Sequence, residues 1–295
     1  GRALLRTMNP RWTGAGLIAL SAVSFGAMAI FARFAFAGGV ELTAVLFLRF
    51  LIAGGVMAAV MLVTRRRWPS RRNMRVLALM GGVGYVGQSL CFFSALKHAS
   101  AGLVSLLLYL YPFLVTVLGV IFLGERLTAL RVAAVIAALL GTALTIGGGL
   151  AGSSLGIALG VATALIYSVY ILVGSRVLKA EDSLAAATVV MLSAAVVFGV
   201  ICWVTEPRFP DSPTAWVAVL AIALVSTVVA MVSFFAGIQR LGAADAATLS
   251  TLEPVVTFGL AAVFLGEPLA LPQAAGGAIV LGAVIALARG DARQN

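Results

Sequence analysis

Several ionisable and polar side chains of this sequence lie deep inside long apolar stretches. Among them are Arg49, Gln88 and Glu253, each flanked on both sides by aliphatic and aromatic residues. A charged or amide group among apolar side chains is destabilising unless it finds a partner. We therefore treat these positions as candidates for binding a polar ligand or for coupling to an ion.

Gln88 belongs to a patterned face. Tyr85, Gln88 and Phe92 recur at intervals of three and four residues, which places them on one side of an α-helix. The Gln88 amide offers donors and an acceptor, which suits the carboxylate and the ammonium group of a ligand. The alternative is a hydrogen bond between helices, an ordinary use of glutamine in apolar surroundings.

A second face carries Thr163, Tyr167 and Tyr170. Aromatic rings bury the apolar area of a ligand, stack on its rings and attract an ammonium group. Tyrosine also anchors helices at a membrane interface, but Tyr167 and Tyr170 both lie in the middle of their apolar stretch. We expect all three residues to line a binding site.

Ser105, Tyr109 and Pro112 are spaced to share a third face, whereas Tyr111 should point roughly the other way. Proline lacks an N–H and leaves a carbonyl unpaired one turn earlier, so we expect a bend at Pro112. Such a bend is either a hinge or fixed. We assign Ser105 and Tyr109 to the binding site and Pro112 to the candidate gating positions.

Glu253 and Pro254 form a similar pair in a later stretch, and Arg49 lies within an earlier one. Three interpretations of Glu253 stay open: it titrates and couples to protons, it remains neutral, or it pairs with backbone groups that Pro254 leaves free. Arg49 either snorkels toward the outer interface, attracts a ligand carboxylate or pairs with Glu253. We group Arg49, Pro112, Glu253 and Pro254 as candidates for coupling or gating.

The composition places these residues in a membrane. Of the 295 residues, 62% are hydrophobic and 10% are charged, whereas soluble domains average about 25% charged residues. A soluble fold needs more polar residues than this to cover its surface. We infer an integral membrane protein.

Apolar runs of about 20 residues, enough to cross a bilayer as a helix, occur ten times. Alternating strand patterns are absent, so the expected fold class is all-α and integral to the membrane. The connections are short and leave no room for a soluble domain. The predicted spans are 13–37, 42–63, 76–97, 101–123, 129–149, 154–178, 184–204, 215–238, 243–265 and 271–288.

Basic residues orient these spans. With the N-terminus in the cytoplasm, sixteen of the twenty Lys and Arg residues fall on the cytoplasmic side, six of them between Arg65 and Arg75. That run lacks interleaved aromatic residues and zinc-ligand spacing, so the formal charge of +10 indicates contact with anionic lipid and not with nucleic acid. Both termini are expected in the cytoplasm, without a cleavable signal and with Met8 as a candidate start.

Two apolar segments repeat each other 142 positions apart. YLYPFLVTVLGVIFLGE at 109–125 and TLEPVVTFGLAAVFLGE at 251–267 share seven of seventeen residues. Each half then holds five spans, and because five is odd the second half crosses the membrane in the opposite sense. Such inverted repeats place a site near the midplane between the halves. We predict two five-helix repeats around a central cavity, 13–149 and 150–288, with cytoplasmic segments at 1–12 and 289–295.

Three longer motifs carry a family resemblance: ALKHASAGLVSLLLYLYPFLVTVLGVIFLGERL at 95–127, LGAADAATLSTLEPVVTFGLAAVFLGEPL at 241–269 and RFLIAG at 49–54. With them the chain resembles the drug/metabolite transporter superfamily, in the ten-span form built from two EamA-type repeats. It is most similar there to bacterial exporters of aromatic and other neutral amino acids. The resemblance implies alternating-access export across the bacterial cytoplasmic membrane. Export of drugs or other metabolites, uptake and, less favoured, a channel remain alternatives.

Other classes find little support in the sequence. One histidine, no HExxH motif and no acidic pair at midplane depth leave no catalytic or metal-binding constellation. No GxxxxGK[ST] loop is present for a nucleotide. We expect a small-molecule substrate and lipid as partners, no cofactor, and a monomer that forms a complete carrier, with the oligomeric state left open.

Overall fold

The computed structural model describes residues 10–99, 101–147, 151–266 and 270–290. Within these ranges the chain is helical, with one isolated bridge between Ala99 and Gly152. Ten helical segments are long and apolar enough to cross a membrane, which confirms the all-α, ten-span prediction. They are Arg11–Ala37, Leu42–Val63, Arg71–Ala95, Leu103–Leu123, Ala129–Ile146, Ser154–Val177, Ser183–Thr205, Pro213–Leu241, Ala243–Leu265 and Leu271–Arg289.

Half of the spans are single helices and half are divided. The single ones are α3 (Leu42–Val63), α8 (Ala129–Ile146), α9 (Ser154–Val177), α10 (Ser183–Thr205) and α15 (Leu271–Gly290). The divided ones are α1 (Pro10–Gly26) with α2 (Met28–Ala37); α4 (Arg71–Leu79), η2 (Met80–Tyr85) and α5 (Val86–Ala95); α6 (Ala101–Leu108) with α7 (Tyr111–Leu123); α11 (Pro213–Ala223), η3 (Leu224–Val229) and α12 (Ala230–Leu241); and α13 (Ala243–Leu249) with α14 (Leu252–Leu265).

The two segments that repeat in the sequence have the same local structure. Pro112 and Pro254 each lie in the first turn of a helix, α7 or α14, directly after a break in the span. Proline cannot donate to the preceding turn, so a helix begins there more easily than it continues. Gly124 and Gly266 end the same helices with φ of +66° and +65°, a conformation that favours glycine. The repeated residues therefore start and stop helices.

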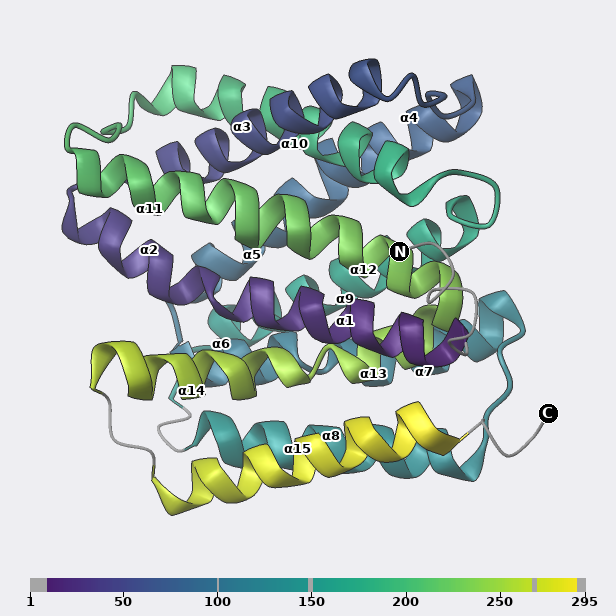
Figure 1. The fold of residues 1–295 in the computed structure, drawn as a ribbon. Coiled ribbons are helices and arrows are strands. Elements are labelled where there is room, and N and C mark those ends of the chain that lie inside the picture. Colours follow the sequence, from purple (N-terminus) through teal and green to yellow (C-terminus); the bar gives the residue numbers. More distant parts are fainter. Residues whose placement is uncertain (1–9, 100, 148–150, 267–269, 291–295) are drawn as a thin grey trace.

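The two halves of the chain interleave in one bundle (Figure 1). α3 packs against α10, α2 against α11, α1 against α12, α5 against α9 and α8 against α15, and each of these pairs joins one half to the other. The beginning of α1 and the end of α15 lie at the same end of the bundle, on the right in Figure 1. We call this the terminal end. The turns between α2 and α3 and between α10 and α11 lie at the opposite end.

Gly81 in η2 allows a very close contact with the neighbouring helix α10. A Cβ built on Gly81 would lie 2.1 Å from Ser193 Oγ and 2.3 Å from the Val190 carbonyl oxygen. Both atoms belong to α10, so η2 and α10 approach until only hydrogen fits between them. Helix association in membranes depends on such small residues, because van der Waals packing replaces the hydrophobic effect there.

Gly81→Ala is therefore expected to destabilise the protein. Overpacking of this kind costs about 1–3 kcal/mol, and we expect a lower melting temperature in detergent. Gly87→Ala is the matched control, because nothing lies within 4 Å of the added Cβ at this nearby position. Equal melting temperatures for the two variants would contradict the packing account.

Candidate functional site

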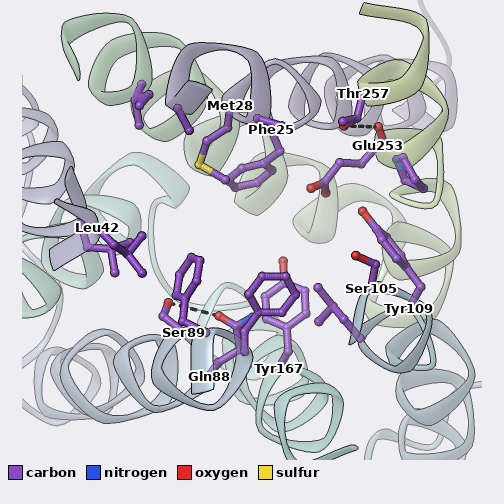
Figure 2. A pocket seen from close by; sticks show the side chains of 18 of the residues that line it. Phe25, Met28, Leu42, Gln88, Ser89, Ser105, Tyr109, Tyr167, Glu253 and Thr257 are labelled. Carbon is purple, nitrogen blue, oxygen red and sulfur yellow. Dashed lines mark hydrogen bonds between the residues drawn. The ribbon is translucent and has the colours of Figure 1, made fainter. Parts of the chain in front are cut away.

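A cavity of about 520 Å³ lies between the two repeats. Its size falls within the range of about 300–1,000 Å³ that small-molecule sites occupy. The first repeat contributes walls from its five spans, and the second contributes α9, α11 and α14. Figure 2 shows side chains converging on this space from several helices. The predicted central cavity between inverted repeats is thus present.

Six of the eight residues predicted to bind a substrate lie in the cavity wall. Figure 2 shows Gln88 and Tyr167 on one side of the cavity and Tyr109 with Ser105 on another. The Gln88 amide oxygen accepts a hydrogen bond from the Ser89 hydroxyl at 3.4 Å. Contact with a ligand stays a prediction for all six, which are Tyr85, Gln88, Phe92, Ser105, Tyr109 and Tyr167.

Thr163 and Tyr170 lie behind the wall, contrary to the expectation that they line it. The Thr163 side chain is fully buried, and its hydroxyl donates to the Leu159 carbonyl oxygen of the preceding turn at 2.9 Å. The Tyr170 ring stacks on Tyr167 and meets Tyr85 edge to face, with centroid distances of 5.8 and 5.9 Å. Only Tyr167 of α9 reaches the cavity, so Tyr170 supports the rings that line it.

Tyr111 corrects a second expectation. It lines the cavity with Tyr109, although two residues along a continuous helix would point in different directions. The chain is not helical at Tyr109 and Leu110, between α6 and α7, and this break turns both rings to the same side. The bend expected at Pro112 is confirmed, but Pro112 itself is buried away from the cavity. Whether the bend is a hinge stays open.

The second span contributes wall residues that sequence patterns did not indicate, and so does the first span, through Phe25, Met28, Ala29, Ala32 and Phe36. Leu42, Val45, Leu46 and Arg49 of α3 all line the cavity. Three of these are aliphatic residues in a uniformly apolar helix, where no periodicity marks one face. The one available signal was the charge of Arg49.

Arg49 does not snorkel to the membrane interface. Its side chain is buried, with 3% of its surface exposed, and three neutral groups accept its hydrogen bonds. Nε donates to Thr227 Oγ1 at 3.0 Å, Nη1 to Met28 Sδ at 3.1 Å and Nη2 to the Tyr85 hydroxyl at 3.4 Å. The guanidinium carbon also lies 4.6 Å from the centre of the Phe50 ring. Arg49 is therefore fixed at the cavity wall.

Glu253 lies in the first turn of α14, and its carboxylate points into the cavity (Figure 2). The Tyr109 hydroxyl lies within hydrogen-bonding reach of it. Among the described residues, no acidic oxygen lies within 4.0 Å of a nitrogen of Arg49, so the Arg49–Glu253 ion pair, one of the three interpretations of Arg49, is not formed. Pro254 also lines the cavity. Its role in gating stays a prediction.

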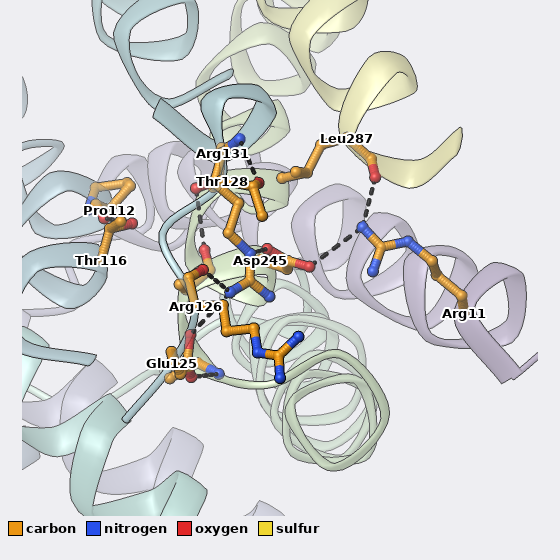
Figure 3. Close-up of polar contacts among 12 residues, drawn as sticks. Arg11, Pro112, Thr116, Glu125, Arg126, Thr128, Arg131, Asp245 and Leu287 are labelled. Atoms are coloured by element: carbon orange, nitrogen blue, oxygen red, sulfur yellow. Dashed lines mark hydrogen bonds and ion pairs between the residues drawn. The ribbon is translucent and has the colours of Figure 1, made fainter. Parts of the chain in front are cut away.

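An ionic cluster joins helices at the terminal end of the bundle (Figure 3). Asp245 of α13, 1% exposed, pairs with Arg131 of α8 at 2.8 Å and with Arg11 of α1 at 3.2 Å. Glu125 lies 3.9 Å from Arg131 and accepts a hydrogen bond from the Ala243 backbone N–H at 3.1 Å. The cluster joins α1 and α8 of the first repeat to α13 of the second. Glu267, the counterpart of Glu125 in the repeat, lies outside the described residues.

Further contacts between the repeats lie at the same end of the bundle. Arg66 pairs with Asp182 at 2.7 Å, Asn73 donates to Glu181 at 2.6 Å, and Arg176 donates to the Phe122 carbonyl oxygen.

The cavity extends away from the terminal end, toward the opposite end of the bundle. Its wall includes Phe36 near the end of α2, Leu42 at the start of α3 and Ile146 at the end of α8. The ionic cluster therefore lies at the terminal end, and the cavity extends toward the other end.

Comparisons with known proteins agree with this architecture. The model of the EamA-like transporter family matches the chain twice, at residues 12–147 and 154–289. A probable terminal-alkyne amino-acid exporter of Streptantibioticus cattleyicolor is 28% identical over 228 residues, 76% of each chain. The aromatic amino acid exporter YddG of Ancylobacter novellus is 26% identical over 202 residues, covering 66% of this chain and 67% of its own. One crystal structure superposes with a TM-score of 0.80 at 25% identity, covering 95% of this chain and 98% of the other.

The direction in which the cavity opens can be tested by thiol labelling. Cys91 and Cys202 are the two native cysteines, so we would replace both with serine and introduce Ser105→Cys in the cavity wall. A membrane-impermeant maleimide should modify this thiol when added on the side away from the termini. Thr163→Cys, at a fully buried position, should stay unlabelled. Labelling of Ser105→Cys from the terminal side alone would contradict the described opening.

Proposed function

The chain belongs to the EamA-like transporter family, and we propose that it exports aromatic or other neutral amino acids from the cytoplasm by alternating access. The observation that carries this proposal is the cavity between the inverted repeats, in which aromatic rings surround a few polar groups. Secondary transporters with inverted repeats bind their substrates in such a position. The names of the two amino-acid exporters that resemble the chain support the same substrate class.

The cavity wall suits a ligand with an apolar or aromatic side chain. Tyr111 meets Tyr167 edge to face with ring centres 4.9 Å apart, and Phe25 and Phe92 complete an extended aromatic surface. Such rings bury apolar area and favour stacked or edge-to-face contact with another ring. Gln88 and Ser105 offer hydrogen bonds for the polar end of a substrate.

The charge distribution supports an orientation for this carrier. Basic residues gather at the terminal end and in the short loops on that side, and such residues favour the cytoplasm. We therefore place the protein in a bacterial cytoplasmic membrane with both termini inside. In that orientation the ionic cluster of Arg11, Glu125, Arg131 and Asp245 is a cytoplasmic gate, and the conformation described here faces outward.

Alternating access requires this gate to open. Asp245 is buried between two arginines that belong to the other repeat. Separation of the repeats at the cytoplasmic end would hydrate all three charges, so the closed gate is held by interactions that water can replace. Opening there and closing around Tyr85 and Tyr109 would pass the substrate from one side to the other.

Transport by purified protein in liposomes tests the proposed substrate class. We expect saturable flux of L-phenylalanine, and Tyr167→Ala should raise its KM about tenfold, because an aromatic pair contributes roughly 0.5–1.5 kcal/mol beyond its buried area. Tyr167→Phe, which keeps the ring, should remain close to wild type. Flux that does not saturate, or no flux of any amino acid, would overturn the proposal.

The gate is tested by Asp245→Asn. Removing one member of a buried ion pair costs about 3–5 kcal/mol, so the closed cytoplasmic end should become less populated. We expect slower labelling of Ser105→Cys from outside in this background. Asp182→Asn is the control, because its ion pair with Arg66 is exposed and such pairs contribute about 0–1 kcal/mol. Equal labelling rates in the two backgrounds would show that the cluster does not act as a gate.

A further inference from the structure

Two ionisable side chains of opposite charge line the cavity, one from each repeat. Arg49 extends from α3 and Glu253 from α14. We infer that they recognise the charged groups of the α-amino acid itself: Arg49 binds the carboxylate and Glu253 binds the ammonium group. This inference rests on the proposed function and specifies which chemical groups of the substrate the site recognises.

The hydrogen-bond partners of Arg49 are all neutral, so among the described residues its charge has no counter-ion within 4.0 Å. A guanidinium group has five N–H donors, and Arg49 directs three of them to a hydroxyl, a thioether and a phenol. A thioether is a weak acceptor, and 3.4 Å is long for the contact with Tyr85. Binding of an anion stabilises a buried cation that has only neutral partners more than it stabilises a cation exposed to water. A carboxylate fits the planar guanidinium group best.

The surroundings hold Arg49 ready for such a ligand. Thr227, which accepts from Nε, donates its own hydroxyl proton to the Ile222 carbonyl oxygen at 2.9 Å. Thr227 lies in η3, a π-helical segment of the second repeat, and π-helical turns are frequent at functional sites. The Phe50 ring lies against the guanidinium group. Arg49 therefore has little freedom to lose when a carboxylate binds.

Glu253 is placed to receive the other charge. Its carboxylate points into the cavity, with the Tyr109 hydroxyl beside it (Figure 2). Arg49 and Glu253 are close enough for their charges to interact but beyond the 4.0 Å limit of an ion pair. The ammonium and carboxylate groups of an α-amino acid lie on one carbon, so a single ligand can occupy the space between the two side chains.

This arrangement predicts discrimination by charge. A ligand that lacks the carboxylate leaves Arg49 unpaired, and one that lacks the ammonium group leaves Glu253 unpaired. A hydrogen bond to a charged group contributes about 1.5–3 kcal/mol, which corresponds to roughly 10- to 100-fold in affinity. The aromatic wall alone would bind amines, acids and zwitterions about equally.

The test in the wild-type protein is competition with L-phenylalanine transport in liposomes. L-Phenylalanine methyl ester and 2-phenylethylamine lack the carboxylate, whereas N-acetyl-L-phenylalanine and 3-phenylpropionate lack the ammonium group. We expect each of the four to compete roughly 10- to 100-fold less well than unlabelled L-phenylalanine. Competition at equal concentrations by any of them would overturn the inference while leaving amino-acid export in place. A protein that transports no amino acid would overturn the proposed function itself.

Variants assign the two charges separately. Arg49→Gln should bind L-phenylalanine and its methyl ester about equally, while it still rejects N-acetyl-L-phenylalanine. Glu253→Gln should show the reverse pattern. Arg208→Gln is the control, because Arg208 is largely exposed and pairs with Glu41 outside the cavity. Unchanged discrimination in a folded Arg49→Gln or Glu253→Gln protein would contradict the assignment, and if a variant fails to fold the wild-type competition decides alone.

Discussion

Polar groups inside a bilayer must find their partners within the protein, because no water is present to bond to them. Most of the described chain meets the requirement with backbone hydrogen bonds inside helical segments, and hydroxyls such as those of Thr116, Thr145 and Ser168 bond to carbonyl oxygens one turn earlier in their own helix. The exceptions concentrate around one place. The helix breaks before Pro112 and Pro254 lie beside the cavity, and so do the charges of Arg49 and Glu253. Both of these helix breaks and both of these charges thus lie in the region that a substrate and water would enter.

Inversion of the repeat explains how one sequence pattern serves both ends of the molecule. The two Pro-initiated helices start near the middle of the bundle and run in opposite directions, so their prolines lie near the cavity and their terminal glycines lie far from it. At one end the segment after Gly124 supplies Glu125 to the ionic cluster. The centre is where the copies differ in chemistry, because Tyr111 precedes the proline in one and Glu253 in the other. This difference gives the two halves unequal roles at a site that they share.

The ionic cluster requires helices to pack closely at one end, whereas the cavity requires helices to stay apart toward the other end. Asp245 holds α1 and α8 together at the terminal end, whereas α2, α3 and α14 stay apart enough to enclose about 520 Å³ toward the other end. The breaks within spans 1 and 9 let each half of a span pack independently.

The sequence by itself determined the ten spans, the bend at Pro112 and the inverted repeat, because apolar length, a missing N–H group and identity in register are local properties. It also placed Tyr85, Gln88 and Phe92 together, since they follow one helical face. Only the tertiary structure decided that Tyr111 joins Tyr109, that Tyr170 lies behind Tyr167 and that Arg49 is enclosed. It alone revealed the pairing of Asp245 with arginines far away in the chain. These features depend on how each helix is rotated and where it breaks, and contacts between distant residues set both.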